Sequence, residues 1–316
     1  MKKVTVIGAG HWGIALATVL ADNGNLVKVW ARRDEEAQLI NKHNSSYFEN
    51  ITLNENITAT SNLDEAMSFS DHILVSIPIV AIIDTLKDYI NTSKTFIFSS
   101  KGLYNGKSMS MLFEEINPES KVSILSGPSF SDEVMEHKYT AVCIASKQEE
   151  LALEVAQLFN SNYFRVYTST DVVGVEYCGA IKNVFAIVCG MLDGANMGSN
   201  TKNAIITRGL SELNRIITFV GGSSHTLHGL AGIGDIMLTC NSFTSRNYSF
   251  GYNYIRGIET KGKTVEGLNT IKEIYKIAKD NNIEMPIINS LYNILFLNSS
   301  LKEEALHLMN RDMKSE

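Results

Sequence analysis

A glycine-rich turn close to the start of the chain constrains its fold more than any other feature. The sequence GAGHWG at residues 8–13 follows the apolar run VTVI and runs directly into the helix-forming stretch IALATVL. Between a strand and a helix, Gly8 permits a tight turn, Gly10 lets the backbone approach a ligand, and Gly13 lets the helix pack closely on the strand. The free N–H groups and positive dipole end of such a helix favour an anion. The motif predicts a site for the pyrophosphate of a dinucleotide; a glycine turn that serves packing alone is the alternative.

Apolar runs alternate with helical patterns through the first half of the chain. The expected strands cover residues 4–7, 26–30, 73–77, 95–98, 122–125, 141–145 and 163–167. The expected helices cover residues 14–20, 35–41, 63–69, 79–90, 109–116 and 149–160. Strands that alternate with helices indicate parallel pairing. We therefore expect an α/β fold with a Rossmann-like, doubly wound and mostly parallel sheet.

The pattern changes near residue 171, after which turn-bounded apolar runs become scarce. Long helical patterns cover residues 175–192, 204–218, 264–281 and 287–298, and Pro286 could occupy the first turn of the last of them. The chain has 316 residues, a length that favours two domains. We expect a dinucleotide-binding domain at residues 1–169 and an all-helical domain at residues 170–316 that carries the substrate and catalytic groups.

Composition and charge exclude several classes of partner. A net charge of −6 provides no basic footprint for nucleic acid. The four cysteines form no CxxC pair, which favours free thiols in a reducing cytoplasm. No apolar stretch reaches the roughly 18 residues of a membrane span, and no targeting segment is recognisable. His225 and His228 lack a third ligand, so no metal site is expected.

The end of the second expected strand bears on the choice of cofactor. An acidic residue at this point would bind the ribose 2′-hydroxyl of NAD, but Arg32 and Arg33 follow the strand and Asp34 comes later. A guanidinium group binds a phosphate through two parallel hydrogen bonds. This favours NADP slightly over NAD, and a solvated basic turn is the alternative.

Two lysines stand where chemistry is expected. Lys101 directly follows the strand at residues 95–98, and ligands of open sheets bind beyond the carboxyl ends of strands. Lys182 shares a helical face with Cys178, Phe185 and Cys189. An amine among hydrophobic side chains is shifted toward its neutral form, which suits a general base. A lysine whose stem packs and whose head reaches solvent is the alternative.

Further polar residues follow in the second half of the chain. Glycines crowd the stretch GLAGIGD at residues 229–235, and Asp235 at its end could orient a lysine or a hydroxyl. Arg246 and Asn247 offer adjacent donors for a phosphate. A turn acid and a surface arginine are the alternatives.

Taken together, these segments identify a family. The chain resembles the bacterial NAD(P)-dependent glycerol-3-phosphate dehydrogenases along nearly its whole length. The matching segments are GAGHWG at residues 8–13, SKG at 100–102, SGPSF at 126–130, GAIKN at 179–183, NTK at 200–202, TRGL at 207–210, GLAGIGD at 229–235, SRN at 245–247 and VEG at 265–267.

The resemblance implies an activity and a set of site residues. The family interconverts sn-glycerol 3-phosphate and dihydroxyacetone phosphate, which supplies the backbone of phospholipids, and a homodimer through the helical domain is expected. Lys182 matches the catalytic proton acceptor. The expected substrate contacts are Lys101, Gly127, Ser129, Lys182, Asp235, Ser245, Arg246 and Asn247. The expected cofactor contacts are His11, Trp12, Arg32, Lys101, Ser131, Arg246 and Glu266, in addition to Gly8, Gly10 and Gly13 of the turn.

The chain departs from the family pattern at three places. His11 replaces a serine in the glycine turn, which puts a side-chain contact to the phosphates in question. Ser131 stands where alanine is usual, and the loop around Tyr47 lacks a proline. None of these changes touches Lys182 or Arg246.

Two other functions remain as alternatives. One is a related two-domain dehydrogenase that acts on another hydroxy acid or sugar acid. The other is a redox-sensing protein that binds a dinucleotide without turnover. The lysine, the aspartate and the phosphate-binding arginine favour the dehydrogenase of the phosphorylated substrate.

Overall fold

One sheet organises the first half of the molecule. The computed structural model describes residues 1–259 and 265–313, and within them eight strands form a single sheet in the order β3-β2-β1-β4-β5-β6-β7-β8. The strands are β1 Lys3–Ile7, β2 Leu26–Trp30, β3 Ile57–Thr60, β4 His72–Val75, β5 Thr95–Phe98, β6 Lys121–Ser126, β7 Thr140–Ala145 and β8 Phe164–Ser169. All neighbours pair in parallel except β6 and β7, which are antiparallel. The expected mostly parallel, doubly wound sheet is confirmed.

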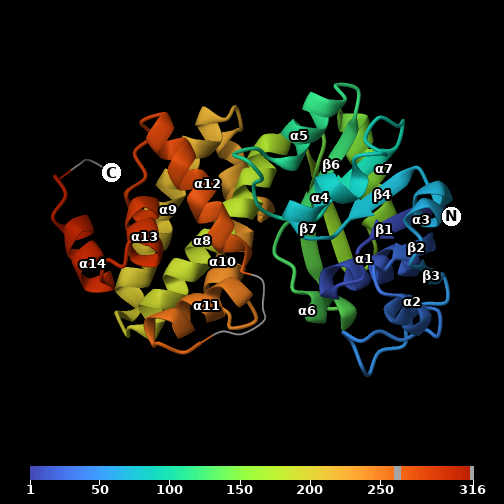
Figure 1. Cartoon of the computed structure of the whole chain (residues 1–316), viewed down its shortest axis with the longest axis horizontal. Helices are drawn as coiled ribbons and strands as arrows, with labels where there is room; N and C mark the ends of the chain where they lie inside the picture. The colour runs from blue at the N-terminus through green and yellow to red at the C-terminus, as the bar shows by residue number, and fades with distance from the viewer. Residues whose placement is uncertain (260–264, 314–316) are drawn as a thin grey trace.

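Helices cover both faces of this sheet and make up the second half of the chain (Figure 1). The sheet is flanked by α1 His11–Asp22, α2 Asp34–Ile40, α3 Leu63–Phe69, α4 Ile79–Leu86, α5 Met109–Ile116, α6 Ser131–Met135 and α7 Glu149–Phe159. The second half contains α8 Val172–Gly194, α9 Gly198–Phe219, a 3₁₀ helix Ser224–His228, a π-helical turn Leu230–Gly234, α10 Asp235–Cys240, α11 Arg246–Ile255, α12 Glu266–Asp280, α13 Pro286–Phe296 and α14 Leu301–Met309. No strand occurs among the described residues beyond Ser169, as expected for a helical domain.

Several elements differ from the sequence-based expectation. Strand β3 was not expected, because its four residues at the sheet edge carry only one fully buried side chain. The short helices α6, α10, α11 and α14 were also missed. Helix α4 ends at Leu86 rather than at residue 90, and α9 begins at Gly198 rather than at residue 204. The expected helix at 264–281 starts at Glu266, and Thr264 lies outside the described residues. Pro286 does occupy the first turn of α13.

Helix α8 is the central element of the second half. Nearly all of its side chains are buried, and Asp171 caps its start by accepting a hydrogen bond from Gly174 N at 3.0 Å. Among the described helices α8 alone is long and apolar enough to cross a membrane, but 89% of its most apolar 18-residue window is buried inside the protein. That is the environment of a core helix.

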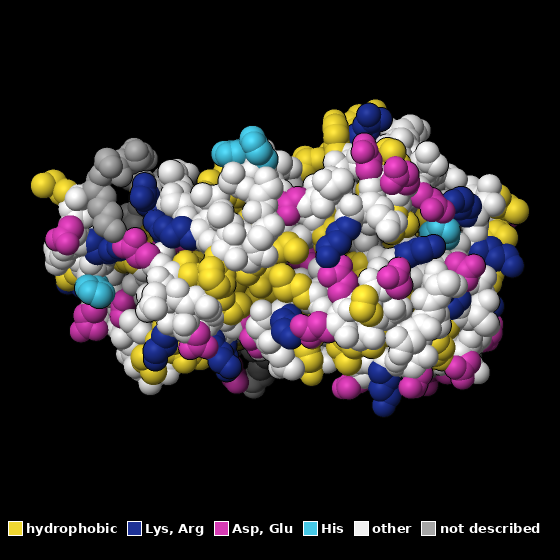
Figure 2. Space-filling view, turned by 90° about the horizontal axis from the view of Figure 1, so that it is seen from above, with side chains coloured by type: hydrophobic (Ala, Val, Ile, Leu, Met, Phe, Trp, Pro, Cys, Tyr) yellow, Lys and Arg dark blue, Asp and Glu magenta, His cyan; other side chains and the backbone are white. Residues whose placement is uncertain are grey.

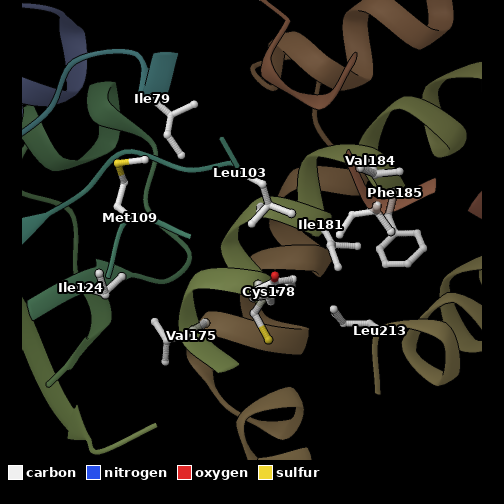
Figure 3. Packing of buried hydrophobic residues seen from close by; sticks show 14 of the residues in the cluster. Ile79, Leu103, Met109, Ile124, Val175, Cys178, Ile181, Val184, Phe185 and Leu213 are labelled. Atoms are coloured by element: carbon white, nitrogen blue, oxygen red, sulfur yellow. The ribbon is translucent and has the colours of Figure 1, made fainter. Parts of the chain in front are cut away.

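The two halves share one continuous apolar core. Figure 3 follows it from Ile79 and Ile124 of the sheet domain, past Val175 and Ile181 of α8, to Leu213 of α9. A second core lies on the other face of the sheet, under α1 and α7. Because α8 packs directly on the sheet domain, the carboxyl ends of the strands are held against the helical domain. On the face shown in Figure 2, charges of both signs are interspersed around apolar side chains.

Glycines bring α8 and α11 into backbone contact. A Cβ atom at Gly190 would lie 2.0 Å from the carbonyl oxygen of Tyr248, and one at Gly251 would lie 2.0 Å from the carbonyl oxygen of Ile187. Gly194 also lies close to α11, since a Cβ atom there would be 2.7 Å from the carbonyl oxygen of Tyr252. Only residues without a side chain allow this spacing. The position of α11 relative to α8 therefore depends on these glycines.

We expect Gly190→Ala to push the two helices apart and to lower the free energy of unfolding by about 1–3 kcal/mol, the usual cost of overpacking. Thermal and denaturant unfolding would measure this loss. Gly10→Ala is the matched control, because a Cβ atom at Gly10 meets no atom within 4 Å and its φ of −80° suits alanine. Equal stability of the Gly190→Ala protein and the wild type would contradict the close-contact account.

Candidate active site

The glycine turn has the geometry that a dinucleotide requires. Gly8 adopts φ +116°, and a Cβ atom there would lie 2.7 Å from the carbonyl oxygen of Ser76. A Cβ atom at Gly13 would lie 1.9 Å from the carbonyl oxygen of Gly8, so α1 packs tightly on the turn. At Gly10 the same atom would project into open space at the start of α1. The turn follows β1 and lies beside the end of β4, at the point where the strand order of the sheet reverses. Ligands of such sheets usually bind in the crevice at this point.

Side chains of the first turn of α1 face a neighbouring loop. His11 is the first residue of α1, and the centroid of its ring lies 4.6 Å from that of Tyr47 and 5.6 Å from that of Phe48. Trp12, the next residue, is half-buried. His11 therefore fills the space between the glycine turn and the loop that lacks the family proline.

The end of β2 presents one unpaired cation. Arg32 is exposed and forms no ion pair with any residue that the structure describes. Arg33 lies 3.8 Å from the Glu36 carboxylate, which partly neutralises it. Asp34 accepts hydrogen bonds from Gln38 and from the Ser61 hydroxyl, at 2.7 Å and 3.0 Å. Of the charged groups at this strand tip, Arg32 is therefore the one available to bind the 2′-phosphate of NADP.

The centre of the site is a buried carboxylate shared by two ammonium groups. Lys182 Nζ lies 2.5 Å from Asp235 Oδ1, and Lys101 Nζ lies 2.8 Å from Asp235 Oδ2. Asp235 is fully buried, and the Lys182 and Lys101 side chains are only 11% and 17% exposed. The Thr239 hydroxyl donates to the Asp235 carbonyl oxygen at 2.6 Å and approaches Oδ1 at 3.4 Å. The three charged residues come from the loop after β5, from α8 and from the start of α10.

One carboxylate cannot balance two buried ammonium groups. Burial and the nearby charge of Lys101 lower the pKa of Lys182, Asp235 only partly opposes the shift, and the resulting pKa is about 7. Burial also opposes the charged form of Lys101, but its pKa is raised by the charge of Asp235 and by its hydrogen bond to that carboxylate. Burial alone would raise the pKa of Asp235, yet the two lysines lower it. At neutral pH the cluster therefore holds Lys101 charged and Lys182 able to give up its proton.

The turn after β6 lies against this cluster. Gly127 adopts φ +143°, and a Cβ atom there would lie 2.9 Å from Val142 Cα. A Cβ atom at Gly179 of α8 would lie 3.1 Å from Ser126 Oγ and 3.6 Å from Lys101 Cγ, so the Lys101 stem passes directly over the helix. The buried Ser126 hydroxyl has no hydrogen-bond partner among the described residues. Ser126 begins the segment SGPSF that sequence reasoning singled out, but it was not among the expected site residues.

The first turn of α11 completes the substrate side. Ser245 caps the helix by accepting a hydrogen bond from Tyr248 N at 3.3 Å. Asn247 is buried, and its Oδ1 atom accepts from Gly267 N at 3.0 Å. Arg246 is exposed. Its guanidinium group is therefore accessible to a ligand.

Glu266, the first residue of α12, belongs to the same neighbourhood. Burial raises its pKa, and the charge of Arg246 opposes this rise most strongly, followed by those of Lys101 and Lys182. Arg246 at the start of α11 and the two buried lysines are therefore close enough to Glu266, at the start of α12, for their charges to affect it.

The remaining expected site residues lie around the glycine turn and the β6 turn. Ser129 donates its hydroxyl to the Gly127 carbonyl oxygen at 3.1 Å, and Ser131 begins α6. Sequence reasoning missed Thr239, although its spacing of four residues from Asp235 could have indicated a shared helical face. Among residues 1–259 and 265–313, no group of three or more His, Cys, Asp or Glu side chains is placed to hold a metal ion.

Family models match both halves of the chain. The model described as the NAD-dependent glycerol-3-phosphate dehydrogenase N-terminus matches residues 3–152, and that of the C-terminus matches residues 171–305. The glycerol-3-phosphate dehydrogenase [NAD(P)+] of Bacillus anthracis is 42% identical over 332 aligned positions, which cover 100% of this chain and 98% of the relative.

Solved structures share the architecture. The crystal structure of glycerol-3-phosphate dehydrogenase from Coxiella burnetii superimposes with a TM-score of 0.91 and 32% identity, over 98% of this chain and 99% of that one. A D-mandelate dehydrogenase in complex with NADH superimposes with a TM-score of 0.63 at 15% identity, over 94% and 98% of the two chains. At that identity the second likeness concerns the fold alone.

We expect Asp235→Asn to destabilise the protein by about 3–5 kcal/mol at pH 6, because two buried ammonium groups lose their counter-charge. Both lysines would then have a folded-state pKa below the unfolded value of about 10.4. Between the folded-state and unfolded-state pKa values of the lysines, the unfolded chain would bind more protons than the folded one. The loss of stability therefore shrinks as the pH rises through this range. Denaturant unfolding at pH 6 and pH 9 would measure it.

Asp71→Asn provides the matched control for this experiment. Asp71 pairs with Lys94 at 3.3 Å, but its side chain is 82% exposed, so its removal should cost less than about 1 kcal/mol. An Asp235→Asn protein as stable as the wild type at pH 6 would refute the shared-carboxylate arrangement.

Proposed function

The chain belongs to the NAD-dependent glycerol-3-phosphate dehydrogenase family, and from its site we propose how it interconverts sn-glycerol 3-phosphate and dihydroxyacetone phosphate. The observation that carries the proposal is the buried Asp235 shared by Lys182 and Lys101. An amine whose pKa is lowered to about 7 can accept and return a proton at neutral pH. Lys182 is the acid and base of the reaction.

Proton transfer follows from this assignment. In the oxidation, neutral Lys182 takes the proton of the C2 hydroxyl, and in the reduction, protonated Lys182 donates it to the ketone oxygen. When bound, NAD or NADP supplies the hydride acceptor or donor. Lys101 keeps its positive charge and stabilises the negative charge that develops on the C2 oxygen. Asp235 orients both amines.

Arg246 and Asn247 hold the substrate phosphate at the start of α11, with Ser245 capping the same turn. The guanidinium group supplies parallel donors, and the helix dipole adds to the attraction. Fixing the phosphate orients C2 toward Lys182, and orientation of this kind can lower a barrier by roughly 7–11 kcal/mol. Lys101, Gly127 and Ser129 provide the remaining substrate contacts.

The turn after β1 would hold the cofactor. Gly8, Gly10 and Gly13 would admit its pyrophosphate, and His11 and Trp12 would contact it. The open space at Gly10 supports this placement. A second group of side chains completes the cofactor contacts: Arg32 at the adenosine end, and Lys101, Ser131, Arg246 and Glu266 toward the helical domain.

The biological setting extends this proposal. The division into residues 1–169 and 170–316 is supported by the two family-model matches and by the change from sheet to helices after Ser169. The enzyme supplies glycerol 3-phosphate for phospholipid synthesis in the cytoplasm and acts as a homodimer. A redox sensor that binds dinucleotide without turnover would not require the perturbed lysine.

We expect Lys182→Met to lower kcat by at least about 100-fold, because general acid–base catalysis is lost. The remaining Lys101–Asp235 pair balances its own charge, so the variant should fold. Absorbance of the reduced nicotinamide with dihydroxyacetone phosphate measures turnover, and Lys94→Met, at the amino ends of the strands, serves as the control. Near-normal turnover of the Lys182→Met enzyme would eliminate the assignment.

The cofactor preference provides a separate prediction. Because Arg32 is the available cation at the tip of β2, the wild type should show a lower KM for NADPH than for NADH. We expect Arg32→Ala to raise the KM for NADPH about tenfold and to leave that for NADH unchanged, the loss typical of a hydrogen bond to a charged group. Because Arg33 already pairs with Glu36, Arg33→Ala should change the KM for NADPH and the KM for NADH by less than about threefold each. A clear preference of the wild type for NADH would contradict this part of the account.

A further inference from the structure

Behind the start of α11 lies a polar network that the site described above does not use. Asp193, in the last turn of α8, accepts two donors on the same oxygen. Lys202 Nζ of α9 lies 2.8 Å from Asp193 Oδ2, and the Tyr248 hydroxyl of α11 donates to Oδ2 as well. Three helices therefore meet at one carboxylate.

Each member of this network has a physical reason to be there. The C-terminal end of a helix disfavours a carboxylate, so Asp193 needs a compensating charge, and Lys202 provides it. The Lys202 and Asp193 side chains are only 17% and 26% exposed, which reduces the screening of their attraction. Tyr248 is 4% exposed, so its buried hydroxyl requires a partner. Burial and the hydrogen bond to Asp193 both raise the pKa of Tyr248.

Tyr248 connects this network to the turn that carries Arg246. It is the third residue of α11, and its backbone N–H donates to Ser245 Oγ at 3.3 Å. Its carbonyl oxygen is the atom that approaches α8 at Gly190. The ring also packs edge-on against Phe243, with centroids 5.0 Å apart. The orientation of the first turn of α11 is thus fixed from the side of α8 and α9.

The opposite side of the same turn is fixed by α12. Asn247 Oδ1 accepts from Gly267 N at 3.0 Å, and a Cβ atom at Gly267 would lie 2.9 Å from the Asn183 carbonyl oxygen. Arg246 is the first residue of this turn and is itself exposed. A shift of the turn would move its guanidinium group without breaking the Lys182–Asp235 contact, because among the described residues no hydrogen bond or ion pair joins the network to that pair.

We propose that Asp193, Lys202 and Tyr248 form a positioning network that fixes the first turn of α11 and thereby sets the affinity for the substrate phosphate. The inference rests on the proposed role of Arg246 as a phosphate ligand. The network acts on substrate affinity and leaves the proton-transfer step of Lys182 unchanged.

The first test compares steady-state constants of point variants. Lys202→Met and Tyr248→Phe should each raise the KM for dihydroxyacetone phosphate by about three- to tenfold, as expected when a buried hydrogen bond is lost. Their kcat and its dependence on pH should stay within about twofold of the wild type. Lys202→Arg, which keeps the charge and the donor, should restore most of the affinity.

Lys94→Met is the matched control for Lys202→Met. The Lys94 side chain is 16% exposed and pairs with Asp71, but it precedes β5 at the amino ends of the strands, away from the site. It should leave the KM unchanged. If Tyr248→Phe and Lys202→Met keep the wild-type KM, or lower kcat and kcat/KM equally, the inference is overturned. Thermal midpoints identify any variant that fails to fold, and Tyr248→Phe then decides the question.

A double-mutant cycle separates the network from the proposed function. We expect Arg246→Ala to raise the KM for dihydroxyacetone phosphate strongly, and Lys202→Met to add less than about twofold in that background, since coupled residues are non-additive. Full additivity of the two effects on KM would overturn the inference about the network and leave the phosphate role of Arg246 intact. An unchanged KM in Arg246→Ala alone would instead overturn that phosphate role, and the inference with it.

Discussion

The site depends on one electrostatic imbalance: a fully buried carboxylate that faces two ammonium groups. Burying a charge is costly unless it is paired, and Asp235 can pair fully with only one of its neighbours. Burial, together with the positive charge of Lys101, lowers the pKa of Lys182, while Lys101 keeps its proton. A group that would titrate far above neutral pH in water becomes an acid and base at neutral pH. The reactivity of Lys182 is thus a property of the cluster, since it requires both neighbours.

The fold maintains this imbalance by keeping water out and the helices close together. Helix α8 lies in an apolar core that continues from the sheet domain, and the Lys182 side chain on this helix is buried. Glycines at positions 190, 194 and 251 allow α11 to pack directly against α8. Gly179 lets the stem of Lys101 cross α8. The turn that carries Arg246 is therefore held near the reacting amine by backbone contact between the two helices, in addition to the Asp193 network.

Sequence alone predicted the parts of this arrangement that depend on local pattern. The strand–glycine–helix order of residues 4–20 predicted the first turn, and the helical spacing of Cys178, Lys182 and Phe185 predicted an amine on a buried face. The contact of Lys101 with Asp235, 134 residues away, has no local signal, because it depends on how α8 packs on the sheet domain. Strand β3 and the Asp193 network were missed for the same reason: edge pairing and the meeting of three helices are tertiary features.

The most direct test of this account is the titration of Lys182 itself. Lysines labelled with ¹³C at Cε can be followed by NMR against pH, with the Lys182 signal assigned by its loss in Lys182→Met. The account predicts that Lys182 titrates near pH 7 in the wild type and at higher pH in Lys101→Gln, where Asp235 has a single ammonium partner. A wild-type Lys182 that titrates near the ordinary lysine value of about 10.4 would contradict it.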